Sequence, residues 1–265
     1  MQPAQPFVRE SGSGPAVVCL HSNASSSAQW RGLMELLAST HRVLAVDSYG
    51  SGKSPEWPSD RVISLDDEVD FIEPVLQRAG APFALVGHSY GAAVALLAAL
   101  RNAERVRALV LYEPSLFAVV DAERPPPNGA DGIKRAVEAA SAALDAGDTD
   151  AAARHFIDYW MGAGSWDAMP ASRKAPIAAS GVNVRRWAHA LTTEPAPAAA
   201  FEALRMPILY MLGDASPESA HAVARVLLPH LPTARRVVLA GLGHMAPITH
   251  PDVVNAEIAR FLAET

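Results

Sequence analysis

Short apolar runs alternate with longer amphipathic segments along most of the chain. The runs are rich in Val and Leu and are apolar at successive positions, which is typical of strands in a parallel sheet that is covered on both faces. Because parallel strands are joined by right-handed crossovers, the alternation predicts an α/β fold with a mostly parallel, doubly wound sheet. The predicted strands are residues 16–21, 42–48, 83–89, 107–113, 207–213 and 235–241.

The segments between these runs have the start and stop signals of helices. The helix predicted after Ser64 has acidic residues in its first turn and ends at Gly80, in agreement with the preferences of helix termini. Other helical patterns follow the first and third predicted strands. Two more lie near the carboxyl terminus, at 216–232 and 250–265.

The alternation breaks after the fourth predicted strand. A run of prolines at 125–127 excludes a helix or a central strand there, because proline lacks an amide proton and has a fixed φ angle. Alanine-rich helical patterns follow, and no strand-like run interrupts them. We therefore expect residues 115–206 to form a helical insertion between two strands, and residues 1–114 and 207–265 to form the core of the fold.

The composition is typical of a globular protein and argues against several other classes of protein. The chain has 265 residues, of which 50% are hydrophobic and 19% charged, which suits one large domain with an insertion. Its net charge of −6 argues against a nucleic-acid-binding surface, which is normally basic. The single cysteine, Cys19, lies in an apolar run, so we expect no intrachain disulfide and a buried, unreactive thiol. With no signal peptide pattern and no run near the ~18 residues of a membrane span, we expect a soluble cytoplasmic protein.

The segment Gly87-His88-Ser89-Tyr90-Gly91 has the pattern G-x-S-x-G, directly after a predicted strand and at the start of a predicted helix. This is the context of a nucleophile elbow, in which a sharp strand-to-helix turn exposes the serine hydroxyl above the sheet. Glycines are needed two positions before and two positions after the serine, because backbone segments come close together at such a turn. The start of the helix adds partial positive charge near the reacting oxygen. The pattern predicts Ser89 as a nucleophile.

A serine hydroxyl is a weak nucleophile until a base accepts its proton, and the chain offers nine histidines. His244 follows the last predicted strand in the segment LAGLGHMAP, where a Gly-rich loop can bring its imidazole back over the sheet. His250 is expected to cap the last helix or to lie on its surface. His88 occupies the variable position of the elbow, and His21 is expected to brace a loop. We therefore predict His244 as the base.

The chain contains four motifs in the order LHSNASSS (20–27), DSYGSGKS (47–54), GHSYG (87–91) and GLGHMA (241–246). These motifs and their order resemble those of the α/β-hydrolase superfamily, over nearly the whole chain. The resemblance implies the α/β-hydrolase fold, a cap formed by the helical insertion, and catalysis by a serine nucleophile. It also accounts for the G-K-S at 52–54, which matches the end of a phosphate-binding loop but lacks that loop's first glycine, so no phosphate site is expected.

Two residues are candidates for the acid that orients the histidine. The superfamily usually supplies it after the strand predicted at 207–213, at a position that is Ser216 here, and the nearest carboxylate, Asp214, lies two positions earlier. A second arrangement places the acid after the preceding sheet strand, where this chain has Glu113. The spacing from Ser89 to Glu113 resembles one branch of the haloalkane dehalogenases. A carboxylate at the end of an apolar strand needs a partner. The positions of these residues relative to the motifs favour Glu113 as the acid, with Asp214 as the alternative.

The resemblance also implies an oxyanion hole. Its donors would be the backbone N–H of Tyr90, the residue after the nucleophile, and that of Asn23, in the loop after the first predicted strand. This loop has Ser22 where the family commonly has glycine. It resembles the halide-binding loop of haloalkane dehalogenases, but those enzymes have an aspartate nucleophile where this chain has Ser89, so halide chemistry is not expected.

Large apolar side chains in and near the insertion are candidates for a substrate pocket. The prediction is therefore a carboxylesterase-like serine hydrolase that cleaves small or medium apolar esters through an acyl-enzyme on Ser89, without a metal or an organic cofactor. Hydrolysis of carbon–carbon bonds, perhydrolysis and lactone opening are alternatives, as is a small-molecule receptor that retains the fold. The candidate pocket residues are Trp30, Phe117, Tyr159, Trp160, Trp187 and Met245.

Overall fold

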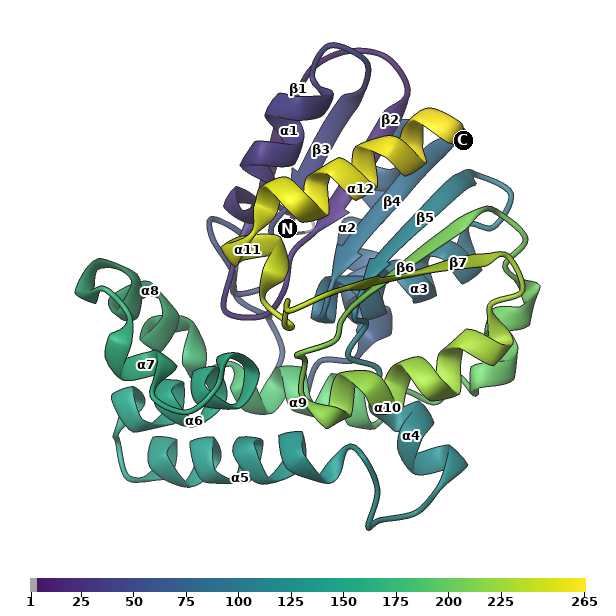
Figure 1. Ribbon diagram of the computed structural model, residues 1–265. Helices are drawn as coiled ribbons and strands as arrows, with labels where there is room; N and C mark the ends of the chain where they lie inside the picture. The colour runs from purple at the N-terminus through teal and green to yellow at the C-terminus, as the bar shows by residue number, and fades with distance from the viewer. Residues whose placement is uncertain (1–3) are drawn as a thin grey trace.

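The computed structural model describes residues 4–265, so the first three residues of the predicted core lie outside it. The described chain forms a seven-stranded sheet with the order β1-β3-β2-β4-β5-β6-β7 (Figure 1). β1 pairs antiparallel with β3, and the other neighbouring pairs are parallel, which confirms the predicted mostly parallel sheet. The strands are β1 (Val8–Ser11), β2 (Ala16–Leu20), β3 (Arg42–Val46), β4 (Phe83–His88), β5 (Val106–Tyr112), β6 (Ile208–Gly213) and β7 (Ala234–Leu239).

β1 is the strand that the sequence pattern does not predict. It lies at the edge of the sheet and pairs only with β3 among the described strands. Its residues are half-buried or exposed, whereas every residue of β2 and β4 is buried. An edge strand of this kind has no continuous apolar run, so its sequence does not differ from that of a loop.

Helices cover both faces of the sheet, and each face has its own apolar core (Figure 1). Along β2, Val18 and Leu20 belong to one core, while Val17 and Cys19 belong to the other, because successive strand side chains point to opposite faces. Burial also raises the pKa of the Cys19 thiol, as expected for an unreactive cysteine. One face packs against α2 (Leu65–Ala79), α3 (Tyr90–Arg101) and α10 (Glu218–Leu227), and the other against α1 (Arg31–Leu37) and α12 (Pro251–Glu264).

Six α-helices lie between β5 and β6, in the region predicted to be an insertion. Figure 1 shows them as a layer beside the end of the sheet where β4 and β5 lead into α3 and α4. The short helices α4, α7 and α8 were not predicted individually, and α8 contains Pro176. The six are α4 (Ala118–Glu123), α5 (Asp131–Asp145), α6 (Thr149–Met161), α7 (Ser165–Ala168), α8 (Ala171–Gly181) and α9 (Val184–Thr192).

Shorter elements complete the chain. Short helices of one or two turns connect the longer elements at η1 (Ser27–Trp30), η2 (Ala198–Ala203), η3 (Leu228–His230) and α11 (Ala246–Thr249). Within residues 4–265, every helix is too short or too polar to cross a lipid bilayer.

The turn after β3 is built around a buried carboxylate. Asp47 accepts hydrogen bonds from the N–H of Ser27 at Oδ1 (2.5 Å) and from that of Lys53 at Oδ2 (2.9 Å). Gly52 has a φ of +56°, and a Cβ there would lie 2.1 Å from Asp47 Oδ2. A phosphate in this loop would meet the negative charge of Asp47. The G-K-S segment therefore forms a tight turn of the fold.

Candidate active site

The turn between β4 and α3 presents Ser89 in a strained backbone conformation. Ser89 has φ +56° and ψ −115°, a region that residues with a Cβ rarely adopt. The glycines on either side are required by space: a Cβ on Gly87 would lie 2.5 Å from Ala92 Cα, and one on Gly91 would lie 2.4 Å from the carbonyl oxygen of Leu20. The G-x-S-x-G pattern therefore allows the close approach of β4, α3 and β2 at this turn.

Ser89, His244 and Glu113 form one hydrogen-bonded line, although the chain separates Ser89 from His244 by 155 positions. His244 Nε2 lies 2.9 Å from Ser89 Oγ, and His244 Nδ1 lies 2.7 Å from Glu113 Oε2. All three side chains are buried. They come together because β4, β5 and the loop after β7 end at the same edge of the parallel sheet.

Two further serines, neither of which was predicted as a site residue, extend the line at both ends. Ser115 Oγ lies 3.0 Å from Ser89 Oγ, and Ser216 Oγ donates to Glu113 Oε1 over 2.6 Å. The N–H of Gly213 donates to the same Glu113 oxygen over 2.7 Å. Ser216 occupies the position that the superfamily usually gives to the acid, which was a signal that this residue belongs to the site.

Asp214, the alternative acid, does not contact His244. Its carboxylate is exposed and accepts a hydrogen bond from the N–H of Gly241 at Oδ1 (2.6 Å). Asp214 thus links the loop after β6 to the loop after β7. Of the two candidate acids, the structure brings only Glu113 to the imidazole.

The loop that carries His244 is fixed from three sides. His88 Nε2 donates to the carbonyl oxygen of His244 (2.8 Å), and the hydroxyl of Tyr112 donates to that of Gly243 (2.8 Å). Burial lowers the pKa of His88 well below its usual range, so its imidazole is neutral. From the inserted helices, the indole of Trp160 stacks on the His244 ring with 3.8 Å between the ring centroids.

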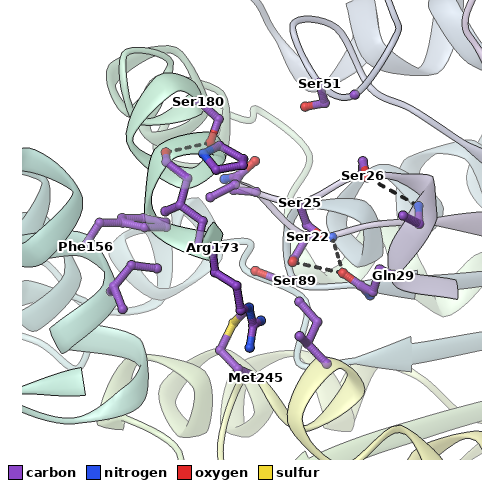
Figure 2. Close-up of a pocket in the computed structure, with 18 of the residues that line it drawn as sticks. Ser22, Ser25, Ser26, Gln29, Ser51, Ser89, Phe156, Arg173, Ser180 and Met245 are labelled. Carbon is purple, nitrogen blue, oxygen red and sulfur yellow. Dashed lines mark hydrogen bonds between the residues drawn. The ribbon is translucent and has the colours of Figure 1, made fainter. Parts of the chain in front are cut away.

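Of the two predicted oxyanion donors, Tyr90 follows Ser89 directly in the chain, and Asn23 lies in the loop after β2. Tyr90 is the first residue of α3, where a backbone N–H has no acceptor within the helix. Asn23 lines both cavities that reach Ser89. Its loop is held by Gln29, whose side-chain oxygen accepts hydrogen bonds from both the N–H and the hydroxyl of Ser22 (3.2 and 3.1 Å; Figure 2).

Backbone strain is concentrated at this site. Within residues 4–265, three residues other than glycine have a positive φ angle: Ala24 (+54°), Ser89 (+56°) and Glu113 (+45°). Ala24 follows Asn23, and the other two belong to the hydrogen-bonded line. Strain of this kind costs of the order of 1–3 kcal/mol per residue and is typical of functional sites.

Two cavities meet at Ser89. The larger has a volume of about 880 Å³ and is lined by several hydroxyl groups, and Ser89, Arg173 and Met245 also line it (Figure 2). The smaller, of about 260 Å³, is mainly apolar. Asn23, Ser89, Phe156 and Trp160 line both, so the nucleophile candidate lies where they join. The predicted pocket residues that line at least one cavity are Phe117, Trp160, Trp187 and Met245.

Two of the predicted pocket residues lie elsewhere, which corrects the sequence analysis. Trp30 is buried in the core between the sheet, α1 and α12, because η1 runs along that face. Tyr159 precedes Trp160 on α6, and adjacent helical residues point in different directions. Its ring packs edge-on against Trp160, and its hydroxyl donates to Ser219 Oγ (2.8 Å) on α10. Tyr159 therefore connects the inserted helices to the core.

A buried carboxylate lies behind the elbow. Glu68 on α2 accepts a hydrogen bond from the hydroxyl of Tyr90 (3.1 Å) and a long one from the N–H of Tyr49 (3.4 Å). Burial raises the pKa of Glu68 to about 8. The folded protein therefore keeps the Glu68 proton over a pH range in which the unfolded chain has lost it.

We expect Glu68→Gln to flatten the pH dependence of stability. Because the folded-state pKa is raised, the unaltered protein loses free energy of unfolding as the pH rises from about 4.5 to 8, by an amount of the order of a few kcal/mol. The glutamine keeps an acceptor for Tyr90 and has no proton to lose. Urea unfolding at pH 5.5, 7 and 8.5 measures the effect, with the exposed Glu35→Gln as the control. Parallel curves for Glu68→Gln and the unaltered protein would contradict the expectation.

Comparisons with known proteins agree with the observed fold. A family model described as "alpha/beta hydrolase fold" matches residues 15–251. The chain is 29% identical to a pimeloyl-[acyl-carrier protein] methyl ester esterase of Aeromonas hydrophila, over 96% of this chain and 98% of the relative. It is 37% identical to a haloalkane dehalogenase of Agrobacterium fabrum, over 40% of this chain and 35% of the relative. The crystal structure of an alpha/beta hydrolase from Sphaerobacter thermophilus aligns with a TM-score of 0.71 at 27% identity, over 97% of this chain and 96% of that one.

The relatives with the higher identities are matched over short regions. Three of them, at 36–39% identity, are covered over only 23–38% of their own lengths. The family model, in contrast, spans most of the chain and includes Ser89, Glu113 and His244. The match, the sheet order and the elbow lead to the same conclusion: this chain belongs to the alpha/beta hydrolase fold family.

Proposed function

We propose that this chain is a serine hydrolase that cleaves carboxylic esters with a small or medium apolar acyl group through an acyl-enzyme on Ser89. The observation that carries the proposal is the continuous line from Ser89 Oγ through His244 to Glu113, with distances of 2.9 and 2.7 Å, beside an apolar cavity. A hydroxyl, an imidazole and a carboxylate in this order form the arrangement that activates a serine.

The geometry supports a two-step reaction. His244 Nε2 accepts the Ser89 proton as Oγ attacks the carbonyl carbon, and Glu113 stabilises the resulting imidazolium through Nδ1. The N–H groups of Asn23 and Tyr90 donate to the oxyanion, a contribution typically worth about 10²–10³ in rate for each donor. His244 then protonates the departing alcohol and later deprotonates the water that hydrolyses the acyl-enzyme.

The neighbouring groups fit these roles. While Ser89 donates to His244, Ser115 can donate to Ser89 Oγ and hold it in position for attack. We assign residues 115–206 to a cap, whose Trp160 covers His244 and limits the access of water. The names of the relatives include an ester hydrolase and a dehalogenase, and a serine at the nucleophile position favours acyl transfer.

Covalent labelling tests the proposal. A fluorophosphonate probe is expected to add to one site per chain, and mass spectrometry of the digested protein is expected to place the adduct on Ser89. A panel of p-nitrophenyl esters is expected to show the highest kcat/KM for acyl chains of about four to eight carbons, which the smaller cavity can accommodate. A protein without the adduct would instead fit a small-molecule receptor. An adduct on another serine would refute the assignment of the nucleophile.

A further inference from the structure

The two cavities that meet at Ser89 differ in charge. The larger is lined by two arginines, Arg31 and Arg173, and neither forms an ion pair within the described chain, residues 4–265. The one carboxylate among its lining residues, Glu56, is paired with Arg186 at 3.1 Å. The larger cavity therefore presents excess positive charge, in a chain whose net charge is −6.

Arg173 is placed to reach a bound substrate. It lies in the first turn of α8, and its side chain makes no hydrogen bond with the described residues. Figure 2 shows this side chain extending towards Met245, and Ser89 lines the same cavity. A guanidinium group presents a rigid pair of N–H donors that matches a carboxylate.

The smaller cavity is mainly apolar and has no excess of positive charge. Ile133, Val137 and Leu191 are among the apolar side chains that line it. Lys134 at its edge is already paired with Asp121 (2.5 Å), whereas Glu138 adds a negative charge. An anionic group would lose its hydration there and meet a like charge, so an uncharged acyl chain is the group that this cavity suits.

We propose that Arg173 binds a carboxylate on the alcohol part of the substrate, while the apolar acyl chain occupies the smaller cavity. The inference rests on the proposed function, because it takes the carbonyl carbon to lie at Ser89, between the two cavities. The bond between that carbon and the ester oxygen breaks, His244 supplies the proton of the departing hydroxyl group, and water completes the acid product. The substrate class is thus an ester of an apolar acid with a hydroxy acid.

A matched pair of esters tests this assignment. The substrate 4-(hexanoyloxy)benzoate carries a carboxylate on its leaving group, and its methyl ester does not. For Arg173→Gln, we expect the ratio of kcat/KM for the carboxylate ester to that for the methyl ester to fall about tenfold, since a charge-assisted pair is lost. Raising the salt concentration from 50 to 500 mM should lower the ratio for the unaltered protein, because ions screen the attraction.

Two variants serve as controls for charge. Arg173→Lys keeps the charge but not the paired donors, so the ratio should fall less than for Arg173→Gln. Lys174→Gln removes the same charge one residue away, where the ammonium lies 5.4 Å from the Trp166 ring centroid, and should leave the ratio within about twofold. An unchanged ratio for Arg173→Gln, or an equal fall for Lys174→Gln, would overturn the carboxylate site.

A binding experiment separates this inference from the proposed reaction. The ether 4-hexyloxybenzoate has the shape of the ester but cannot be hydrolysed, and 4-hexyloxybenzamide is its neutral counterpart. Isothermal titration should show that the protein binds the carboxylate more tightly and that Arg173→Gln loses about tenfold in affinity for it. Such binding without any Ser89-dependent hydrolysis would support the carboxylate site and reject the reaction. Equal binding of both ethers would overturn the site even where hydrolysis is observed.

Discussion

Ser89→Ala is expected to lower kcat/KM for p-nitrophenyl hexanoate by roughly 10⁴- to 10⁶-fold while the protein stays folded. The change removes the oxygen that would form the acyl-enzyme, and the imidazole of His244 then has no hydroxyl to deprotonate. The positive φ at this position strains serine and alanine alike, so the melting temperature should change little. Initial rates at high protein concentration and a thermal unfolding curve measure the two quantities.

Ser115→Ala is the matched control, because it removes the same hydroxyl group from a residue whose Oγ lies 3.0 Å away. It deletes one hydrogen bond to Ser89 and leaves the nucleophile, so a loss of about 2- to 20-fold is expected. The fluorophosphonate probe should still label this variant and should not label Ser89→Ala. Turnover by Ser89→Ala within tenfold of the unaltered protein would refute the nucleophile assignment.

The sheet could be predicted because its central strands are buried on both faces. Runs such as that at 83–88 have no polar side chain before His88, and every residue in them is buried. The edge strand at 8–11 could not be found in this way, because half of its environment is solvent. The pocket was predicted only in part, because an apolar side chain such as Trp30 fits a core as well as a cavity. The face of the sheet on which Trp30 packs depends on how the loop after β2 folds.

The candidate site depends on contacts that no local pattern contains. Gly213 and Glu113 are 100 positions apart, and their hydrogen bond exists because β5 and β6 are neighbours in the sheet. The G-x-S-x-G pattern between a strand and a helix predicted Ser89, and the Gly-rich loop after the last strand predicted His244. The acid stayed open because Glu113 and Asp214 both follow strands that end at the same edge, and only the direction of each side chain separates them.

Glu113→Gln is expected to lower kcat by roughly 10³- to 10⁴-fold. The N–H of Gly213 points at Glu113 Oε1 over 2.7 Å and can only donate, so the amide oxygen of the glutamine must face it. The amide nitrogen then faces His244 Nδ1 and donates to it. This arrangement places the remaining imidazole proton on Nε2, where it prevents His244 from accepting the proton of Ser89.

Asp214→Asn is the matched control for this change, since it neutralises the other candidate acid with the same carboxylate-to-amide replacement. Its oxygen can still accept from the N–H of Gly241, and its side chain is exposed, so kcat should stay within about threefold. Steady-state rates for the two variants, at a pH where the unaltered protein is stable, give the comparison. A larger loss in Asp214→Asn than in Glu113→Gln would mean that the loop after β6 rearranges to supply the acid. Mild losses in both would mean that His244 is oriented by its backbone contacts to His88 and by Trp160, without a carboxylate.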